Sequence, residues 1–211
     1  MTTTDDYRAF VAGKHAVVES VGVDVSPDDL PVRLFDWQKD VVVWALRKGR
    51  AALFLDTGLG KSGCALAWAD AVVNHTGMPV LILTPLAVGP QFVSEAEKFG
   101  VPGVELWREG TAARIQVVNY HKLHLIDTTQ YGGVVIDESS ILKSFMGKVK
   151  RQLCEAFADC RFRLACTATP APNDHMELGN HSAFLGVMDA DEMLTRWFIN
   201  DLSQAGVYRL K

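Results

Sequence analysis

Apolar residues in this chain gather in short continuous runs, which alternate with segments whose apolar positions recur at helical spacing. Runs such as 80–84 and 134–136 are almost wholly apolar, which is typical of strands buried on both faces. Short strands separated by helices predict a parallel sheet sandwiched between helices, an α/β fold. The expected strands are 51–55, 80–84, 104–107, 115–118, 134–136 and 162–166, and the expected helices are 36–48, 61–74, 91–99, 120–126 and 148–158.

The first 30 residues differ in composition from the rest of the 211-residue chain. They hold six acidic residues against two basic ones, which accounts for the whole formal net charge of −4. A short helix is expected near residues 6–19, and the proline-containing residues 22–31 are expected to form a linker or turn. We therefore expect an accessory segment over residues 1–30 and an α/β domain over residues 31–211.

The composition also bears on location and redox state. No apolar stretch reaches the roughly 18 to 20 residues that a membrane-spanning helix needs, and the first residues lack the basic and apolar regions of a secretory signal. We expect no membrane partner and a cytoplasmic location, in the host cytoplasm if a virus encodes the chain. The four cysteines form no CxxC pair and are expected to stay free.

One expected strand is followed by a glycine-rich loop that ends in Lys61 and Ser62. Gly58 and Gly60 let the backbone approach a ligand closely, and backbone N–H groups at a helix N-terminus bind phosphate. The full GxxxxGK[ST] pattern is not met, because Leu55 stands where its first glycine would be. The alternative is a simple strand-to-helix turn. Phosphate contacts are expected from Thr57, Gly58, Leu59, Gly60, Lys61, Ser62 and Gly63.

A second expected strand ends in two adjacent carboxylates, Asp137 and Glu138. One carboxylate can hold Mg²⁺ while the other orients a water, a division of labour that NTP hydrolysis requires and NTP binding does not. Alone, the pair is equally well explained as a helix N-cap followed by an acidic first-turn residue. Together with the loop, it predicts a hydrolytic P-loop site in which Lys61 binds phosphate, Ser62 and Asp137 hold Mg²⁺, and Glu138 activates water.

Segments around these two strand ends resemble the superfamily 2 helicases and translocases, especially the Swi/Snf-like branch. The resemblance covers about residues 34–185 and implies a RecA-like P-loop fold that uses ATP and Mg²⁺. Motif II reads Asp-Glu-Ser-Ser, so it departs from the DEAD and DEAH branches at its third and fourth positions. The resembling segments are 34–40 (Q-motif region), 53–62 (motif I), 81–92 (motif Ia), 117–120, 137–144 (motif II), 164–170 (motif III) and the continuation at 171–174 and 177–178.

The resemblance also implies roles for single residues. Gln38 would read the adenine edge, and the neighbouring Phe35 and Trp37 would either wall the base pocket or pack against nearby elements. Thr167 and Thr169 would couple ATP hydrolysis to contact with the nucleic-acid strand. The nucleic-acid backbone is expected to meet Thr84, Pro85, Asn119 and Lys143, the last in a basic segment over residues 143–163 whose alternative is a solvated amphipathic helix.

Further expectations concern what the resembling segments lack or leave open. Residues 186–211 are too few to form the family's second RecA-like lobe, so we expect a fragment whose missing C-terminal lobe supplies an arginine finger. The chain alone is then expected to bind weakly and hydrolyse little. Ser139 and Ser140 are expected to hydrogen-bond toward motif III. The apolar stripe over residues 188–198 is expected to be a helical face packed on the lobe, the alternative being a surface for partner structure.

Three classes of function are compatible with these patterns. The first is the N-terminal ATPase lobe of a translocase that moves on double-stranded DNA. The second is a strand-separating helicase that acts on single-stranded DNA or RNA. The third is a non-catalytic lobe that binds ATP or nucleic acid with little turnover. Stimulation of ATP hydrolysis by duplex, by single strands or by neither distinguishes the three.

Overall fold

The computed structural model of the chain describes residues 19–31, 33–144, 148–171, 177–200 and 208–210. The helix expected near residues 6–19 falls almost entirely outside these ranges, as do residues 172–174 of the segment that follows motif III. All six strands expected from the apolar runs are described, and each begins and ends within one residue of its predicted bounds.

A six-stranded parallel sheet forms the centre of the fold, in the order β1-β6-β5-β2-β4-β3. Every neighbouring pair in it runs parallel, so the carboxyl ends of all six strands meet at one edge. The predicted α/β fold is confirmed. The strands are β1 (Arg50–Phe54), β2 (Val80–Thr84), β3 (Val104–Leu106), β4 (Ile115–Asn119), β5 (Gly133–Asp137) and β6 (Phe162–Thr167).

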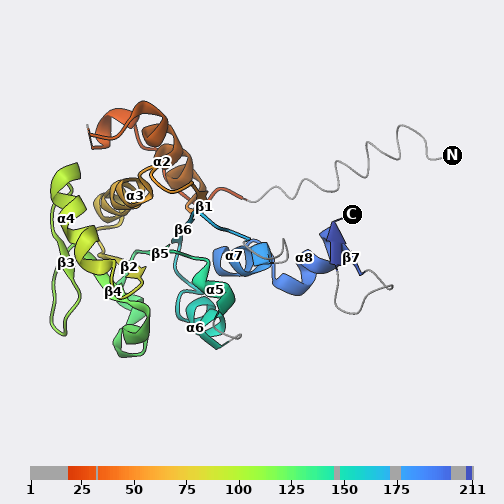
Figure 1. The fold of residues 1–211 in the computed structure, drawn as a ribbon. Helices are drawn as coiled ribbons and strands as arrows, with labels where there is room; N and C mark the ends of the chain where they lie inside the picture. The colour runs from red at the N-terminus through yellow and green to blue at the C-terminus, as the bar shows by residue number, and fades with distance from the viewer. Residues whose placement is uncertain (1–18, 32, 145–147, 172–176, 201–207, 211) are drawn as a thin grey trace.

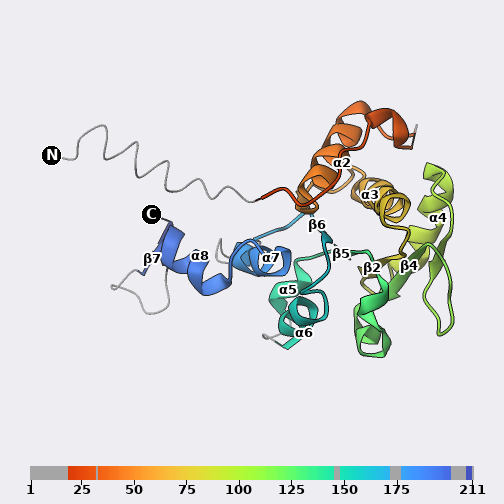
Figure 2. The ribbon, with the colours of Figure 1, turned by 180° about the vertical axis from the view of Figure 1, so that it is seen from behind.

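Helices cover both faces of this sheet, as Figure 1 and the reverse view in Figure 2 show. One face carries α2 (Asp36–Lys48), α3 (Lys61–Thr76) and α4 (Gly89–Phe99). The other carries α5 (Ile141–Ser144), α6 (Lys148–Ala156) and α7 (Leu178–Leu185). The helix expected over 120–126 is a 3₁₀ helix, η2 (Tyr120–Leu125), which the Asn119 side chain caps by accepting from the amide of His121. Two further 3₁₀ turns are η1 (Pro27–Asp29) and η3 (Thr128–Gln130).

The alternation of side chains along the strands explains why the core has two halves. In β2, Leu81, Ile82 and Leu83 are all 0% exposed. Ile82 packs into the cluster under α2, α3 and α4, whereas Leu81 and Leu83 pack into the cluster on the opposite face. Successive strand residues point to opposite faces, so one apolar run supplies both clusters. Burial of each such side chain contributes about 1.5–3 kcal/mol.

Residues 22–31, which were expected to be a linker or turn, lie together with Val21 against the end of α2. The amides of Val21 and Val23 donate to the carbonyls of Lys48 and Leu46 at 3.2 and 2.9 Å. Leu30 is buried in the core cluster beneath α2 and α3. Backbone bonds and a buried leucine therefore attach this segment to the α/β domain.

A small extension lies beyond the β1 end of the sheet in Figure 1. It consists of α8 (Ala190–Trp197) and an antiparallel hairpin of β7 (Phe198–Asn200) and β8 (Tyr208–Leu210). Met193 and Phe198 are buried, so the expectation that this apolar stripe packs on the lobe holds for these two residues.

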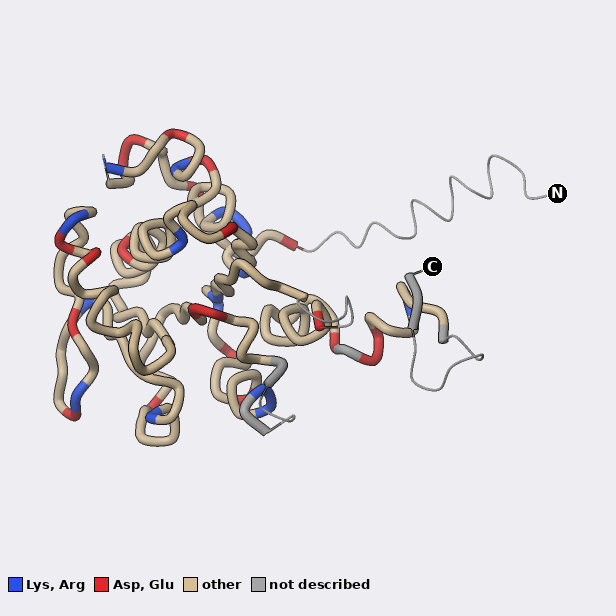
Figure 3. The backbone as a smooth tube through the Cα atoms, viewed as in Figure 1, with Lys and Arg blue, Asp and Glu red and all other residues tan. Residues whose placement is uncertain are grey.

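Charge is distributed without a single dominant sign over the described backbone. Figure 3 shows Lys and Arg interspersed with Asp and Glu on most helices and loops. Within the described ranges, no helix is both long and apolar enough to cross a membrane. The four cysteines are free, as expected, and Cys64 and Cys166 are buried.

Candidate active site

The glycine-rich loop connects β1 to the N-terminus of α3. Gly58 and Gly60 have φ angles of 84° and 75°, in the region that favours glycine, and Gly60 is the N-cap of α3. The Lys61 ammonium donates to the carbonyls of Leu55 and Asp56, at 2.9 and 3.1 Å. Its charge is therefore held over the loop, where the amides of the first helical turn are free to bind an anion.

Gln38 holds this loop from α2. It is 4% exposed, its Nε2 donates to the carbonyl of Leu59 at 3.0 Å, and its Oε1 accepts from the amide of Phe35 at 3.0 Å. A Cβ added at Gly60 would lie 2.4 Å from Gln38 Nε2, so the tight approach requires glycine at that position. Both ends of the Gln38 amide are thus engaged within the chain, and its role in reading adenine stays a prediction.

The two aromatic residues beside Gln38 are open to solvent. Phe35 is 69% exposed and Trp37 is 41% exposed. Packing against nearby elements covers more than half of Trp37 but little of Phe35, so both alternatives stay open for Trp37. A base that entered beside the loop would find both of them accessible.

Asp137 is the last residue of β5 and is only 6% exposed. Burial, together with the charge of Glu138, raises the pKa of Asp137 from 3.8 to about 7, while nearby Lys61 acts in the opposite direction. A buried carboxylate of this kind suits a cation, because the cation compensates for the lost hydration.

Glu138 has a φ of 51°, and it is the one non-glycine residue with positive φ in the described ranges. Such a conformation costs on the order of 1–3 kcal/mol and is concentrated at functional sites. The strained turn directly follows β5, so Asp137 ends the strand while the adjacent Glu138 lies outside it.

Strand β6 places the motif III threonines between the loop and the acidic pair. It lies between β1 and β5 in the sheet, with Cys166 opposite both Leu53 and Asp137. Thr167 is fully buried, and its Oγ1 accepts from the amide of Thr169 at 3.1 Å. Three of the predicted segments therefore meet on three adjacent strand ends.

The Ser139 side chain does not bond toward motif III as expected. Its backbone amide does, donating to the carbonyl of Cys166 at 2.9 Å. The fully buried Ser139 Oγ instead lies 2.9 Å from Nε2 of His181 on α7. A neutral imidazole accepts or donates equally well there, and burial lowers the pKa of His181 and favours that neutral form.

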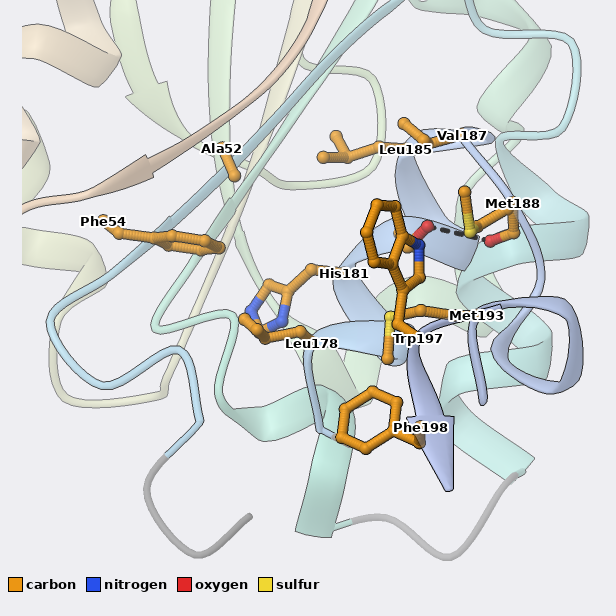
Figure 4. A pocket seen from close by; sticks show the side chains of 11 residues that line it. Ala52, Phe54, Leu178, His181, Leu185, Val187, Met188, Met193, Trp197 and Phe198 are labelled. Atoms are coloured by element: carbon orange, nitrogen blue, oxygen red, sulfur yellow. Dashed lines mark hydrogen bonds between the residues drawn. The ribbon is translucent and has the colours of Figure 1, made fainter. Parts of the chain in front are cut away.

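His181 was missed by the sequence analysis, and no local signal marks it. Its ring meets the Phe54 ring edge-on with 5.3 Å between centroids, so it contacts both the end of β1 and motif II. It also lines an apolar pocket of about 450 Å³ between β1, α7 and α8, which Figure 4 shows with Met193, Trp197 and Phe198 on the opposite wall.

The residues expected to meet nucleic acid fall into two groups. Thr84 and Asn119 are opposite each other in the β2–β4 register and line a groove of about 220 Å³. Thr84 itself is 1% exposed, and its hydroxyl donates to the carbonyl of Pro85 at 3.1 Å, so this groove is reached mainly through its neighbours. Lys143 lies in α5, but its side chain is outside the described part of the structure.

The same groove contains two residues that the sequence analysis did not select. Trp107 and Lys122 line it, and the Lys122 ammonium lies 6.0 Å from the centroid of the Trp107 ring. Leu86, at the rim, is 77% exposed. A cation beside an aromatic ring is a combination that contacts phosphate and base, and its spacing in sequence, 15 residues apart, gave no hint of it.

Part of the basic segment over residues 143–163 is structural, so the expectation that this segment meets the nucleic-acid backbone does not hold for Arg163. Arg163 is 4% exposed and donates to the carbonyls of Cys160 at 2.9 Å, Phe184 at 2.7 Å and Ala158. Arg161 donates to the carbonyl of Gly22 at 3.0 Å. The buried Arg163 guanidinium is therefore not available to phosphates, whereas Arg161 is exposed and uses only part of its guanidinium on backbone carbonyls.

The donor set near the loop fits Mg²⁺ bound together with a polyphosphate. The described residues contain no cluster of three or more His, Cys, Asp and Glu that would hold a metal by themselves. Mg²⁺ commonly needs only one or two carboxylates when substrate phosphates and waters complete its shell. The buried Asp137 supplies one such carboxylate, and Ser62, on the first turn of α3, is partly exposed to a ligand on the loop.

Comparison with known proteins bears on the fold of the chain. No protein-family model matches the chain. It is 28% identical, over 169 residues, to the DNA annealing helicase and endonuclease ZRANB3 of Mus musculus, a match that covers 71% of this chain and 16% of ZRANB3. This chain therefore corresponds to a small part of that protein.

Two examples illustrate the solved structures that share this fold. The SWI2/SNF2 ATPase core domain of Sulfolobus solfataricus has a TM-score of 0.65 at 20% identity, covering 82% of this chain and 39% of that one. The UvsW helicase of bacteriophage T4 has a TM-score of 0.61 at 16% identity, covering 89% and 66%. By its parallel sheet and these likenesses, the chain has the RecA-like fold found in superfamily 2 helicase and ATPase domains.

Proposed function

We propose that this lobe binds ATP with Mg²⁺ and, together with a second RecA-like lobe, hydrolyses ATP to drive movement on double-stranded DNA. One observation carries the proposal. The ends of β1, β6 and β5 are adjacent in the sheet, and they bear the glycine-rich loop with Lys61, the threonine Thr167 and the pair Asp137-Glu138. The residues proposed for phosphate binding, cation binding and water activation therefore all lie at the carboxyl edge of the sheet.

Each residue of this edge has a role in the proposed reaction. Lys61 and the amides around Gly60 hold the phosphates, and Ser62 with Asp137 would hold Mg²⁺. Mg²⁺, when bound, neutralises charge on the phosphates during transfer. Glu138 orients the attacking water and accepts its proton. Lys61 is a single cation, so we expect the second lobe to contribute the arginine that completes charge neutralisation.

Nucleic acid is proposed to lie along the groove at the ends of β2 and β4. Lys122 and the rim around Asn119 can contact the phosphodiester backbone of the nucleic acid without reading its bases. We therefore expect the affinity for DNA to be independent of sequence and sensitive to salt. The Sulfolobus solfataricus SWI2/SNF2 ATPase core has been solved in complex with double-stranded DNA, and this favours duplex as the substrate. The helicase names of ZRANB3 and UvsW keep strand separation as the second candidate.

The test is ATP hydrolysis by the chain, alone and combined with a second RecA-like lobe, in the presence of duplex DNA, single-stranded DNA or RNA. Stimulation by duplex supports the proposal, and stimulation by single strands supports the second candidate. ATP binding without stimulated turnover in the two-lobe protein would reduce the chain to a binding module. Affinity for duplex that does not fall between low and high salt would remove the groove assignment.

A further inference from the structure

A buried tyrosine connects the groove to the acidic strand end. Tyr120 is 8% exposed, and its hydroxyl donates to the backbone carbonyl of Asp137 at 2.5 Å. Strand β2 lies between β4, which leads into Tyr120, and β5, which ends at Asp137, so the side chain reaches across a whole strand. Burial raises the pKa of the Tyr120 phenol well above its usual value, and the hydroxyl remains a donor.

The acceptor of this bond is mechanically important. The Asp137 carbonyl belongs to the peptide group that joins the two carboxylate-bearing residues, and rotation of that peptide changes the φ of Glu138. Glu138 already has a φ of 51°, which a non-glycine residue adopts only when its surroundings hold it there. The Tyr120 hydroxyl is one of the groups that hold it. The next peptide group, between Glu138 and Ser139, is held by the Ser139 amide, which donates to the carbonyl of Cys166.

The other side of Tyr120 leads directly to the groove. The preceding residue, Asn119, lines the groove, and its side chain caps η2, the helix that begins with Tyr120. Lys122, also on η2, lines the same groove. A ligand that engages Asn119 and Lys122 therefore acts on the short helix whose first residue holds the Asp137–Glu138 peptide.

We propose that Tyr120 is a positioning residue that transmits occupancy of the groove by duplex DNA to the Asp137–Glu138 peptide, so that DNA and Mg²⁺-ATP bind cooperatively. The proposal rests on the function proposed above and adds a regulatory connection to it. Tyr120 touches neither ligand; it fixes the orientation of the two carboxylates that do. Removal of its hydroxyl should abolish the cooperativity between the two sites, while DNA and Mg²⁺-ATP still bind.

The test compares Tyr120→Phe with Tyr131→Phe in the full chain. Tyr131 is also 8% exposed and also donates a buried hydrogen bond, to Gln116 Oε1 at 2.7 Å, but it precedes β5 at the far edge of the sheet. ATP affinity is measured by calorimetric titration with Mg²⁺, with and without a saturating short DNA duplex. The ratio of the two affinities is the coupling factor, which we expect to be roughly five or more in the wild type.

We expect Tyr131→Phe to keep this factor and Tyr120→Phe to bring it close to one, while ATP affinity in EDTA stays the same in all three proteins. If Tyr120→Phe keeps the wild-type coupling factor, or if the wild-type factor is one, the inference about Tyr120 is wrong, and the proposed function is not affected. Failure of the wild type to bind ATP or DNA even when it is combined with the second RecA-like lobe overturns the proposed function instead.

A second measurement does not depend on how well the variant folds. Amide hydrogen exchange over residues 137–142 should change when duplex binds the wild-type chain in the absence of ATP. No change in those residues, with duplex bound, contradicts the proposed transmission.

Discussion

Replacing Asp137 with asparagine is expected to stabilise the folded chain at neutral and alkaline pH, although it removes a residue of the proposed site. The Asp137 side chain is 6% exposed. Burial, and then the adjacent Glu138, raise the pKa of this carboxyl from 3.8 to about 7. Asparagine has nearly the same shape and carries no charge to desolvate, so it avoids the cost of an ionised carboxylate in this position.

The magnitude follows from proton linkage. Between pH 3.8 and about 7, the folded chain binds more protons at Asp137 than the unfolded chain does, so its free energy of unfolding falls as pH rises. The shift of about three pH units, at 1.36 kcal/mol for each, corresponds to about 4 kcal/mol once the pH is above 7. The Asp137→Asn variant lacks this loss, and its advantage over the wild type should grow through that window and then level off.

Urea unfolding followed by circular dichroism, at a series of pH values from 4 to about 8.5, measures the difference between Asp137→Asn and the wild type. Asp127→Asn is a control of opposite sign, because hydrogen bonds from Thr129 and Gln130 lower the pKa of Asp127. Its contribution is fully present above the unfolded pKa of 3.8 and is lost mainly below it, so the difference for Asp127→Asn should stay nearly constant over most of this pH series. A difference for Asp137→Asn that does not increase with pH would refute the assignment of a buried, destabilised carboxylate.

Three other variants separate the roles of the site and its scaffold. Glu138→Gln should bind ATP normally and lower turnover of the two-lobe protein by at least about a hundredfold, as for loss of a general base, and retained turnover would exclude that role. Gly60→Ala should destabilise the chain by about 1–3 kcal/mol and weaken ATP binding by displacing Gln38, whereas Gly77→Ala, with a φ of 69° and open space around it, should leave ATP binding intact. Arg163→Leu should lower the free energy of unfolding, measured in urea, by about 3 kcal/mol, because it leaves buried carbonyls unpaired. The exposed Arg151→Leu should lower it by about 0.5 kcal/mol or less. Arg163→Leu should not change the affinity for DNA.

The strands could be predicted from the sequence, and so could the glycine-rich loop after β1 and the acidic pair at the end of β5, because their signals are local. An apolar run such as 80–84 must be buried on both faces wherever it lies, and a glycine loop before Lys61 has a limited set of conformations. Helix type was less predictable: residues 120–125 form a 3₁₀ helix because Asn119 caps a short segment. The extension with α8 and the β7–β8 hairpin carried only an apolar stripe as its signal.

The interactions that organise the site lie far apart in sequence. Tyr120 bonds to a residue 17 positions away, Arg163 to one 21 away, and Ser139 to one 42 away. Nothing in the residues between them specifies these partners, because each depends on the strand order and on how the helices pack. The basic segment over 143–163 shows the same limit, since its charge pattern could not reveal that Arg163 is buried.

By itself, the sequence determined that the chain forms a parallel α/β sheet and that a glycine-rich loop and an acidic pair stand at the ends of two of its strands, because burial and backbone chemistry depend on residue types at short spacing. Only the tertiary structure decided that β6 lies between those strands, that His181 contacts both of their ends, and that Tyr120 holds the Asp137–Glu138 peptide. Those contacts arise from the lateral order of strands, which long-range packing sets and local patterns do not encode.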